Sequence, residues 1–87
     1  RGEPDLLASC YRNSLKLAAA HGIRSIAFPS ISTGIYGYPV EEAAKVALSV
    51  VASFLTAGNR LPDYIRFVLF DEATFAAYEK ALLDLAP

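Results

Sequence analysis

The segment Ser30-Ile31-Ser32-Thr33-Gly34-Ile35-Tyr36-Gly37-Tyr38-Pro39 decides how the fold of this 87-residue chain is interpreted. Its content of Ser, Thr, Gly and Pro is typical of a loop. The apolar run Ile23–Ile31, with β-branched and aromatic residues, leads into it and predicts a buried strand. From Val40 onward, apolar residues recur at helical spacing, with two glutamates in the first turn. The segment therefore joins the carboxyl end of a strand to the amino end of a helix.

A loop in this position suits an anion. Open α/β sheets bind ligands at the carboxyl ends of their strands, and a helix start offers free N–H groups and a partial positive charge. Gly34 and Gly37 carry no Cβ, so the backbone can approach a phosphate closely. Hydroxyl and aromatic side chains come from Ser32, Thr33, Tyr36 and Tyr38. The alternative is an ordinary turn, because the GxGxxG and GK[ST] phosphate-binding patterns are both missing.

The flanking sequence predicts an α-β-α-β-α order. One helix opens at Pro4-Asp5 and stops at Gly22, and the helix from Val40 stops at Ala57-Gly58-Asn59. A second strand, Tyr64–Phe70, is followed by Asp71, which caps a last helix with Phe75, Tyr78, Leu82 and Leu85 on one face. Strand, helix and strand form a βαβ unit, so we expect parallel strands and a right-handed crossover.

The strands predict a wider sheet than two strands provide. Their apolar character indicates a sheet covered on both faces, and two parallel strands alone make a poor sheet. The composition agrees, because 54% of the residues are hydrophobic in a short chain. We therefore expect part of a domain, with its sheet completed by further strands or by a second chain.

Phe70 ends the second predicted strand, which places it at the same sheet edge as the loop. An aromatic ring there could stack on a nucleotide base. The alternative is a core position like that of Phe67, and the pattern of apolar residues alone favours the core.

Charge and hydropathy exclude several classes of protein. The net charge is −1 and no basic run occurs, so we expect no nucleic-acid partner. No apolar run reaches the roughly 18–20 residues of a membrane span, so no membrane partner is expected. The single cysteine, Cys10, cannot form an internal disulfide, which agrees with a cytoplasmic location.

The residues predict no catalytic group, metal site or cofactor. Cys10 lies on an apolar helix face and is interpreted as a core residue, with Arg12 on a different face and unable to activate it. Cys10 and the only histidine, His21, make a poor set of metal ligands. No serine lies in a GxSxG motif. Glu41 and Lys45 are expected to form a solvated i,i+4 pair.

Three segments together resemble the macro domain family: Leu6–Leu15 (LLASCYRNSL), Ile26–Pro39 (IAFPSISTGIYGYP) and Val68–Glu72 (VLFDE). The resemblance is closest to the bacterial and mitochondrial-type O-acetyl-ADP-ribose deacetylases, and it covers essentially the whole chain. It implies the three-layer α/β/α macro-domain fold, with residues 1–87 as the C-terminal portion of one domain.

The resemblance also implies roles for individual residues. The family binds ADP-ribose at the carboxyl edge of its sheet. By position, the backbone from Ser32 to Tyr36 would wrap the diphosphate and distal ribose, Tyr36 would pack on that ribose, and Phe70 would stack on the adenine beside Asp71. The implied ligand-binding residues are Ser32, Thr33, Gly34, Ile35, Tyr36, Gly37, Phe70 and Asp71.

The first half of the family's domain has no counterpart in the 87 residues. That half carries the strand-end Asp that reads the adenine amino group, the Asn-Ala-Ala-Asn segment and a glycine-rich loop with an Asp, and these groups perform most of the hydrolysis in the active branch. Three functions therefore stay open. The completed domain could hydrolyse O-acetyl-ADP-ribose or an ADP-ribosyl ester, it could read ADP-ribose or ADP-ribosylated protein without turnover, or the chain could be an inactive half that needs an N-terminal half or a second chain.

Overall fold

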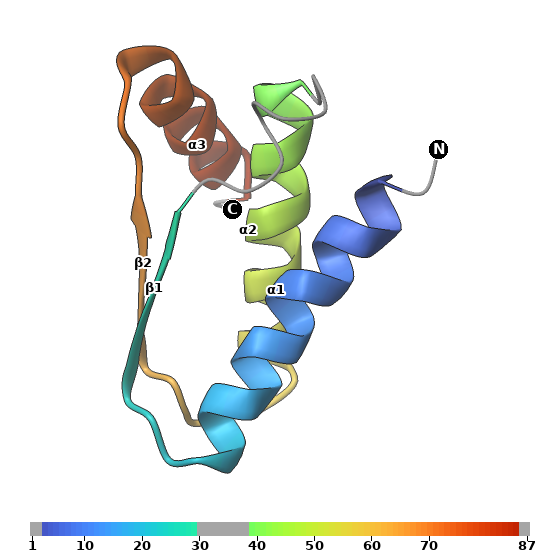
Figure 1. Ribbon diagram of the computed structural model, residues 1–87, viewed down its shortest axis with the longest axis vertical. Helices are drawn as coiled ribbons and strands as arrows, with labels where there is room; N and C mark the ends of the chain where they lie inside the picture. Colours follow the sequence, from blue (N-terminus) through green and yellow to red (C-terminus); the bar gives the residue numbers. More distant parts are fainter. Residues whose placement is uncertain (1–2, 30–38, 86–87) are drawn as a thin grey trace.

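The computed structural model describes residues 3–29 and 39–85, and Figure 1 shows how their helices and strands are arranged. The elements are α1 (Glu3–Ala20), β1 (Ser25–Pro29), α2 (Val40–Thr56), β2 (Tyr64–Val68) and α3 (Glu72–Leu85). The predicted order α-β-α-β-α is confirmed. β1 and β2 pair in parallel, with Ser25 opposite Tyr64 and Pro29 opposite Val68, as predicted for a βαβ unit.

Both strands are shorter than the apolar runs that predict them. β1 begins at Ser25 rather than Ile23, because the turn that ends α1 occupies the residues before it. β2 ends at Val68 rather than Phe70, because the last pair of the parallel ladder is Pro29 with Val68. Leu69 and Phe70 therefore follow the strand instead of ending it.

Predicted stop signals end the first two helices. At Gly22, which has a φ of 69°, the chain turns so that the Ile23 N–H donates to the Ala18 carbonyl at 2.9 Å. This is the Schellman arrangement, in which a left-handed glycine lets the chain satisfy carbonyls of the last turn. After α2, the Asn59 side-chain amide donates to the Phe54 carbonyl at 2.7 Å, so a side chain satisfies a last-turn acceptor there.

The core lies on one face of the sheet and joins all three helices. The Phe28 and Phe67 rings, on neighbouring strands, have centroids 5.7 Å apart. Tyr11 of α1 packs against Phe28, and Tyr78 of α3 packs against Phe67. Small residues of α2 let the helices approach this cluster closely, and the buried ones are Ala43, Ala44 and Ala47.

The opposite face of the two strands is exposed. Side chains alternate along a strand, so the residues between the core positions all point to this face: Ser25, Ala27, Pro29, Tyr64, Arg66 and Val68. The expectation of strands covered on both faces is therefore not met within the described residues, because all three helices pack against a single core cluster (Figure 1). The described residues form one helical layer on a two-stranded parallel sheet.

Some apolar side chains of the helices are less buried than predicted. On the predicted apolar face of α3, Tyr78 is buried, whereas Phe75, Leu82 and Leu85 are exposed. Cys10 is exposed as well, which corrects its interpretation as a core residue. In the part of the chain that the structure describes, no helix is both long enough and apolar enough to cross a membrane.

Candidate functional site

The carboxyl ends of both strands and the starts of α2 and α3 lie at the same end of the molecule (Figure 1). The chain leaves β1 after Pro29 and returns at Pro39, immediately before α2. This is the edge at which the loop was predicted to bind an anion. Most of the predicted binding residues lie outside the described residues, namely Ser32, Thr33, Gly34, Ile35, Tyr36 and Gly37.

The start of α2 presents N–H donors that its N-cap residue does not cap. Pro39 occupies the N-cap position in an extended conformation, and it makes no side-chain capping hydrogen bond. The first intrahelical bond runs from the Ala43 N–H to the Pro39 carbonyl at 3.0 Å. Earlier N–H groups in a helix have no intrahelical acceptor, so those of the first turn of α2 can donate to a ligand or to water.

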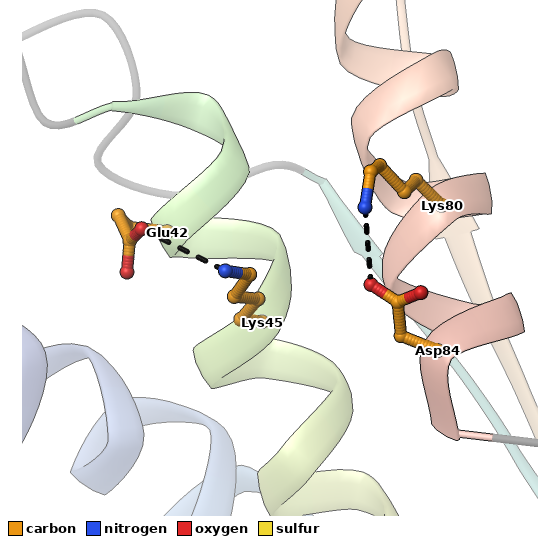
Figure 2. A network of polar contacts seen from close by, with 4 residues as sticks. All are labelled: Glu42, Lys45, Lys80 and Asp84. Carbon is orange, nitrogen blue, oxygen red and sulfur yellow. Dashed lines mark hydrogen bonds and ion pairs between the residues drawn. The ribbon is translucent and has the colours of Figure 1, made fainter.

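Acidic residues in the first turn of α2 form a surface ion pair. The Glu42 carboxylate lies 3.9 Å from the Lys45 ammonium, as Figure 2 shows. Glu41 and Lys45 are both exposed, as predicted for a solvated helix face, but Lys45 pairs with Glu42 at i,i+3 rather than with Glu41 at i,i+4. Both partners in the observed pair are largely exposed, so the pair contributes little to stability.

Phe70 lies at this edge with its side chain in solvent. It follows β2 directly, and 84% of its surface is exposed, so the core interpretation is wrong for the described residues. It lines a shallow hollow of about 310 Å³ together with Leu69, Asp71, Glu72 and Phe75. An aromatic ring of this kind on the surface is available to stack against a planar ligand.

Asp71 caps α3, as predicted. Its Oδ1 accepts a hydrogen bond from the Thr74 backbone N–H at 2.7 Å. That bond, followed by one from the Thr74 side chain, holds the pKa of the Asp71 carboxyl below its usual value. The cap fixes the backbone directly after Phe70. The Asp71 carboxylate also lies beside the hollow. It can accept a hydrogen bond from an N–H or O–H group of a ligand, whereas its negative charge would repel a phosphate.

The other described titratable side chains do not form a candidate metal site. Within residues 3–29 and 39–85, no group of three or more His, Cys, Asp or Glu side chains could hold a metal ion. Cys10 and His21 are both exposed. Cys10 lies within α1, whereas His21 lies in the turn that follows it.

A second hollow was missed by the sequence analysis. It lies between α1 and α2 and has Arg12, Lys16, Ser49 and Ser53 on its walls. The signal that could have found it is two cations spaced i,i+4 on one helix and two serines spaced i,i+4 on the next. Only the packing of the two helices shows that these rows face the same groove.

Comparison with known proteins identifies the family. The model of the family described as "Macro domain" matches residues 1–47. An O-acetyl-ADP-ribose deacetylase of Klebsiella pneumoniae is 56% identical over 82 residues, which cover 94% of this chain and 46% of that protein. A macro domain-containing protein of Chlorobaculum tepidum is 57% identical over 81 residues, covering 93% of this chain and 46% of its own length.

Solved structures agree with the sequence relatives. The Oceanobacillus iheyensis macrodomain with ADP superposes with a TM-score of 0.89 at 43% identity, covering 97% of this chain and 43% of that one. The Trypanosoma brucei macrodomain in complex with ADP-ribose gives a TM-score of 0.85 at 42% identity, with 91% and 34% covered. The α-β-α-β-α unit is thus a portion of the macro-domain fold, and the chain belongs to the macro domain family. It spans about half the length of the curated relatives it matches.

Proposed function

We propose that this chain contributes one side of an ADP-ribose-binding site. The observation that carries the proposal is the position of Phe70. Its ring is exposed at the sheet edge where the chain leaves β1 for the Ser30–Tyr38 segment. Proteins of the same fold that cover almost the whole chain have been solved with ADP and with ADP-ribose, which supports a ligand with an adenine and a diphosphate.

The parts of this ligand match different chemical groups at the edge. The diphosphate would lie against the backbone of Ser32, Thr33, Gly34, Ile35, Tyr36 and Gly37 and against the uncapped start of α2. Phe70 would stack on the adenine, a contact of about 1–3 kcal/mol per base in other nucleotide-binding proteins. Asp71 would accept a hydrogen bond from the adenine or its ribose.

We further propose that the completed domain hydrolyses O-acetyl-ADP-ribose or an ADP-ribosyl ester. Relatives named O-acetyl-ADP-ribose deacetylase, at 50–56% identity, support this activity. The family segments that carry most of the hydrolysis have no counterpart in these 87 residues, so the reactive groups would come from the rest of the completed domain. A module that binds ADP-ribose or ADP-ribosylated protein without turnover is the second candidate, and the same exposed Phe70 favours it equally.

The exposed sheet face supports completion of the domain by other chain segments. Both strands have an unpaired edge within the described residues, and one face of the sheet is open. An N-terminal half or a second chain would pair with these edges and cover Ala27, Arg66 and their neighbours. We place the protein in the cytoplasm, without a nucleic-acid or membrane partner at this site.

Isothermal titration calorimetry of the 87-residue chain with ADP-ribose tests the binding proposal. We expect saturable heat with ADP-ribose and weaker binding of AMP and of ribose 5-phosphate, since each holds only part of the ligand. A well-folded domain, completed by an N-terminal half, that gives no heat with ADP-ribose would refute the proposal. Release of acetate from O-acetyl-ADP-ribose by the completed domain would separate the hydrolase from the reader, because a reader binds without producing acetate.

A further inference from the structure

The groove between α1 and α2 is a candidate site separate from the ligand edge. It is an open hollow of about 500 Å³, with Arg12 and Lys16 on the α1 side and Ser49 and Ser53 on the α2 side. Phe54, which is almost fully buried, forms part of its apolar floor. The groove therefore combines two cations, two hydroxyls and an apolar base in one elongated hollow.

The polar groups form two rows. Arg12 and Lys16 are four residues apart on α1, and Ser49 and Ser53 are four residues apart on α2. Such i,i+4 residues stand above one another on a helix, with Cβ atoms about 5–6 Å apart. A ligand along the groove would meet a cation from one wall and a hydroxyl from the other, twice, at an interval of one helical turn.

The two cations have no acidic partner in the described part of the chain. Three other cations do. The Arg24 guanidinium lies 3.1 Å from the Asp63 carboxylate, and two lysines that line a smaller hollow between α2 and α3 are paired as Glu42–Lys45 and Lys80–Asp84. Figure 2 shows these last two pairs, in which each lysine has a carboxylate partner. The α1–α2 groove keeps its positive charge, although the whole chain carries a net charge of −1.

Negative and positive side chains also lie at different ends of α1 and α2. Among the described side chains of α1 and α2, the acidic ones lie in the first turns, and these are Asp5, Glu41 and Glu42. Both helices run away from the ligand edge, so the groove residues lie toward the opposite end (Figure 1). Arg60, which follows Asn59 of the groove wall, adds a further exposed cation there. An acidic partner approaching this end meets cations and no competing carboxylate in the groove.

We propose that the α1–α2 groove binds an acidic peptide segment that presents two carboxylates about one helical turn apart. Each carboxylate has lone pairs for a cation and for a serine hydroxyl at once, and the apolar floor accepts the side-chain methylenes. A nucleic acid fits less well, because the groove has no exposed aromatic ring for base stacking and only two cations for phosphates. This function is independent of ADP-ribose binding.

Fluorescence anisotropy with the 87-residue chain tests the proposal. The probe is a short fluorescein-labelled helical peptide with two glutamates at i and i+4, and its partner peptide has glutamines there. We expect the glutamate peptide to bind more tightly and to lose affinity as salt is raised. Arg12→Gln/Lys16→Gln should weaken binding roughly tenfold, since each exposed ion pair contributes a few-fold.

Lys45→Gln/Lys80→Gln is the matched control, because it changes the net charge equally but removes cations that are already paired. It should leave the affinity unchanged. Ser53→Glu, which places a carboxylate in the groove and keeps both cations, should also weaken binding. If the Arg12/Lys16 variant loses its helical circular dichroism and is therefore unfolded, the Ser53→Glu variant still tests whether the peptide binds in the groove.

Several results would overturn the proposal. One is the absence of glutamate-peptide binding at millimolar concentration, and another is an equal loss in the control variant. Tighter binding of a single-stranded oligonucleotide with the same dependence on Arg12 and Lys16 would assign the groove to nucleic acid instead. Displacement of the peptide by inorganic phosphate at the peptide's own concentration would assign it to a small anion.

Discussion

Tyr11 of α1 meets Phe28 of β1 edge to face, with ring centroids 4.9 Å apart and ring planes 72° apart. Both side chains are buried, and Tyr11 is fully so. Edge-to-face contacts bring the positive ring edge to the negative ring face and add to the energy of burial. This pair fixes α1 on the sheet, and Phe28 in turn contacts Phe67 of β2.

Phe28→Ala should lower the free energy of unfolding by about 3 kcal/mol, because it removes a buried ring and leaves a cavity between α1 and the sheet. Urea denaturation followed by circular dichroism measures the change. Ala27→Ser is the control: its side chain lies one position earlier on the exposed face, so its stability should match that of the parent chain. Equal midpoints for the Phe28 variant and the parent would contradict the assigned core.

Gly22→Ala should destabilise the chain through the backbone alone. Gly22 has a φ of 69°, and a Cβ there would meet no atom within 4 Å, so no steric contact contributes. The left-handed conformation costs an L-residue roughly 1–2 kcal/mol, and the stiffer unfolded chain offsets part of this. Gly22→Asn should cost less, because asparagine tolerates this conformation. Thermal denaturation that ranks Asn below Ala in stability would be evidence against a left-handed stop.

Asp71→Ala should lower the stability of α3, because the Thr74 N–H loses its acceptor. Asp71→Asn should retain most of it, since asparagine is an equally good N-cap. The folded-state pKa of Asp71 is lowered, so the unfolded state binds the proton more readily. This stabilising contribution is present above the unfolded-state pKa, near 3.9, and is lost as the pH falls through the folded pKa. Urea midpoints between pH 6 and pH 2 should fall less steeply for the Asn variant than for the parent.

Tyr78 should make the chain less stable in alkali. Burial raises the pKa of its hydroxyl, and this outweighs the opposing effect of the nearby Tyr11 hydroxyl. The folded state thus keeps this proton after the unfolded state has lost it near pH 10, and stability falls as the pH rises above that value. Tyr78→Phe should flatten the decline in urea midpoint between pH 9 and pH 11. An unchanged slope in that variant would assign the alkaline loss to another group.

The sequence predicts those features of the fold that depend on neighbouring residues in the chain. The Gly22 stop, the Asp71 cap and the parallel pairing follow from local residue types and from element order, and the structure confirms them. The exposure of Cys10 and Phe70 could not be predicted, because periodicity marks a face as apolar without showing what covers it. The apolar content of Tyr64–Val68 predicts a buried strand, yet the described residues cover only one of its faces.

The candidate site was also only partly predictable from the sequence. Its position at the strand edge follows from the βαβ order, whereas the residues of the Ser32–Gly37 loop keep their roles as predictions. The α1–α2 groove escaped notice because Arg12 and Ser49 are far apart in sequence, and neither belongs to a recognisable motif. Only tertiary packing brings them to one hollow.

Phe70→Ala should weaken ADP-ribose binding by about tenfold or more, since stacking on a base contributes about 1–3 kcal/mol and this ring is otherwise free in solvent. Its folding stability should be unchanged for the same reason. Tyr64→Ala is the matched control, because Tyr64 is also an exposed aromatic residue but lies at the other end of β2. Calorimetry with ADP-ribose should give the parental affinity for Tyr64→Ala. If both variants lost affinity equally, the effect would come from the sheet rather than from a stacking contact, and Phe70 would have no role in recognising the adenine.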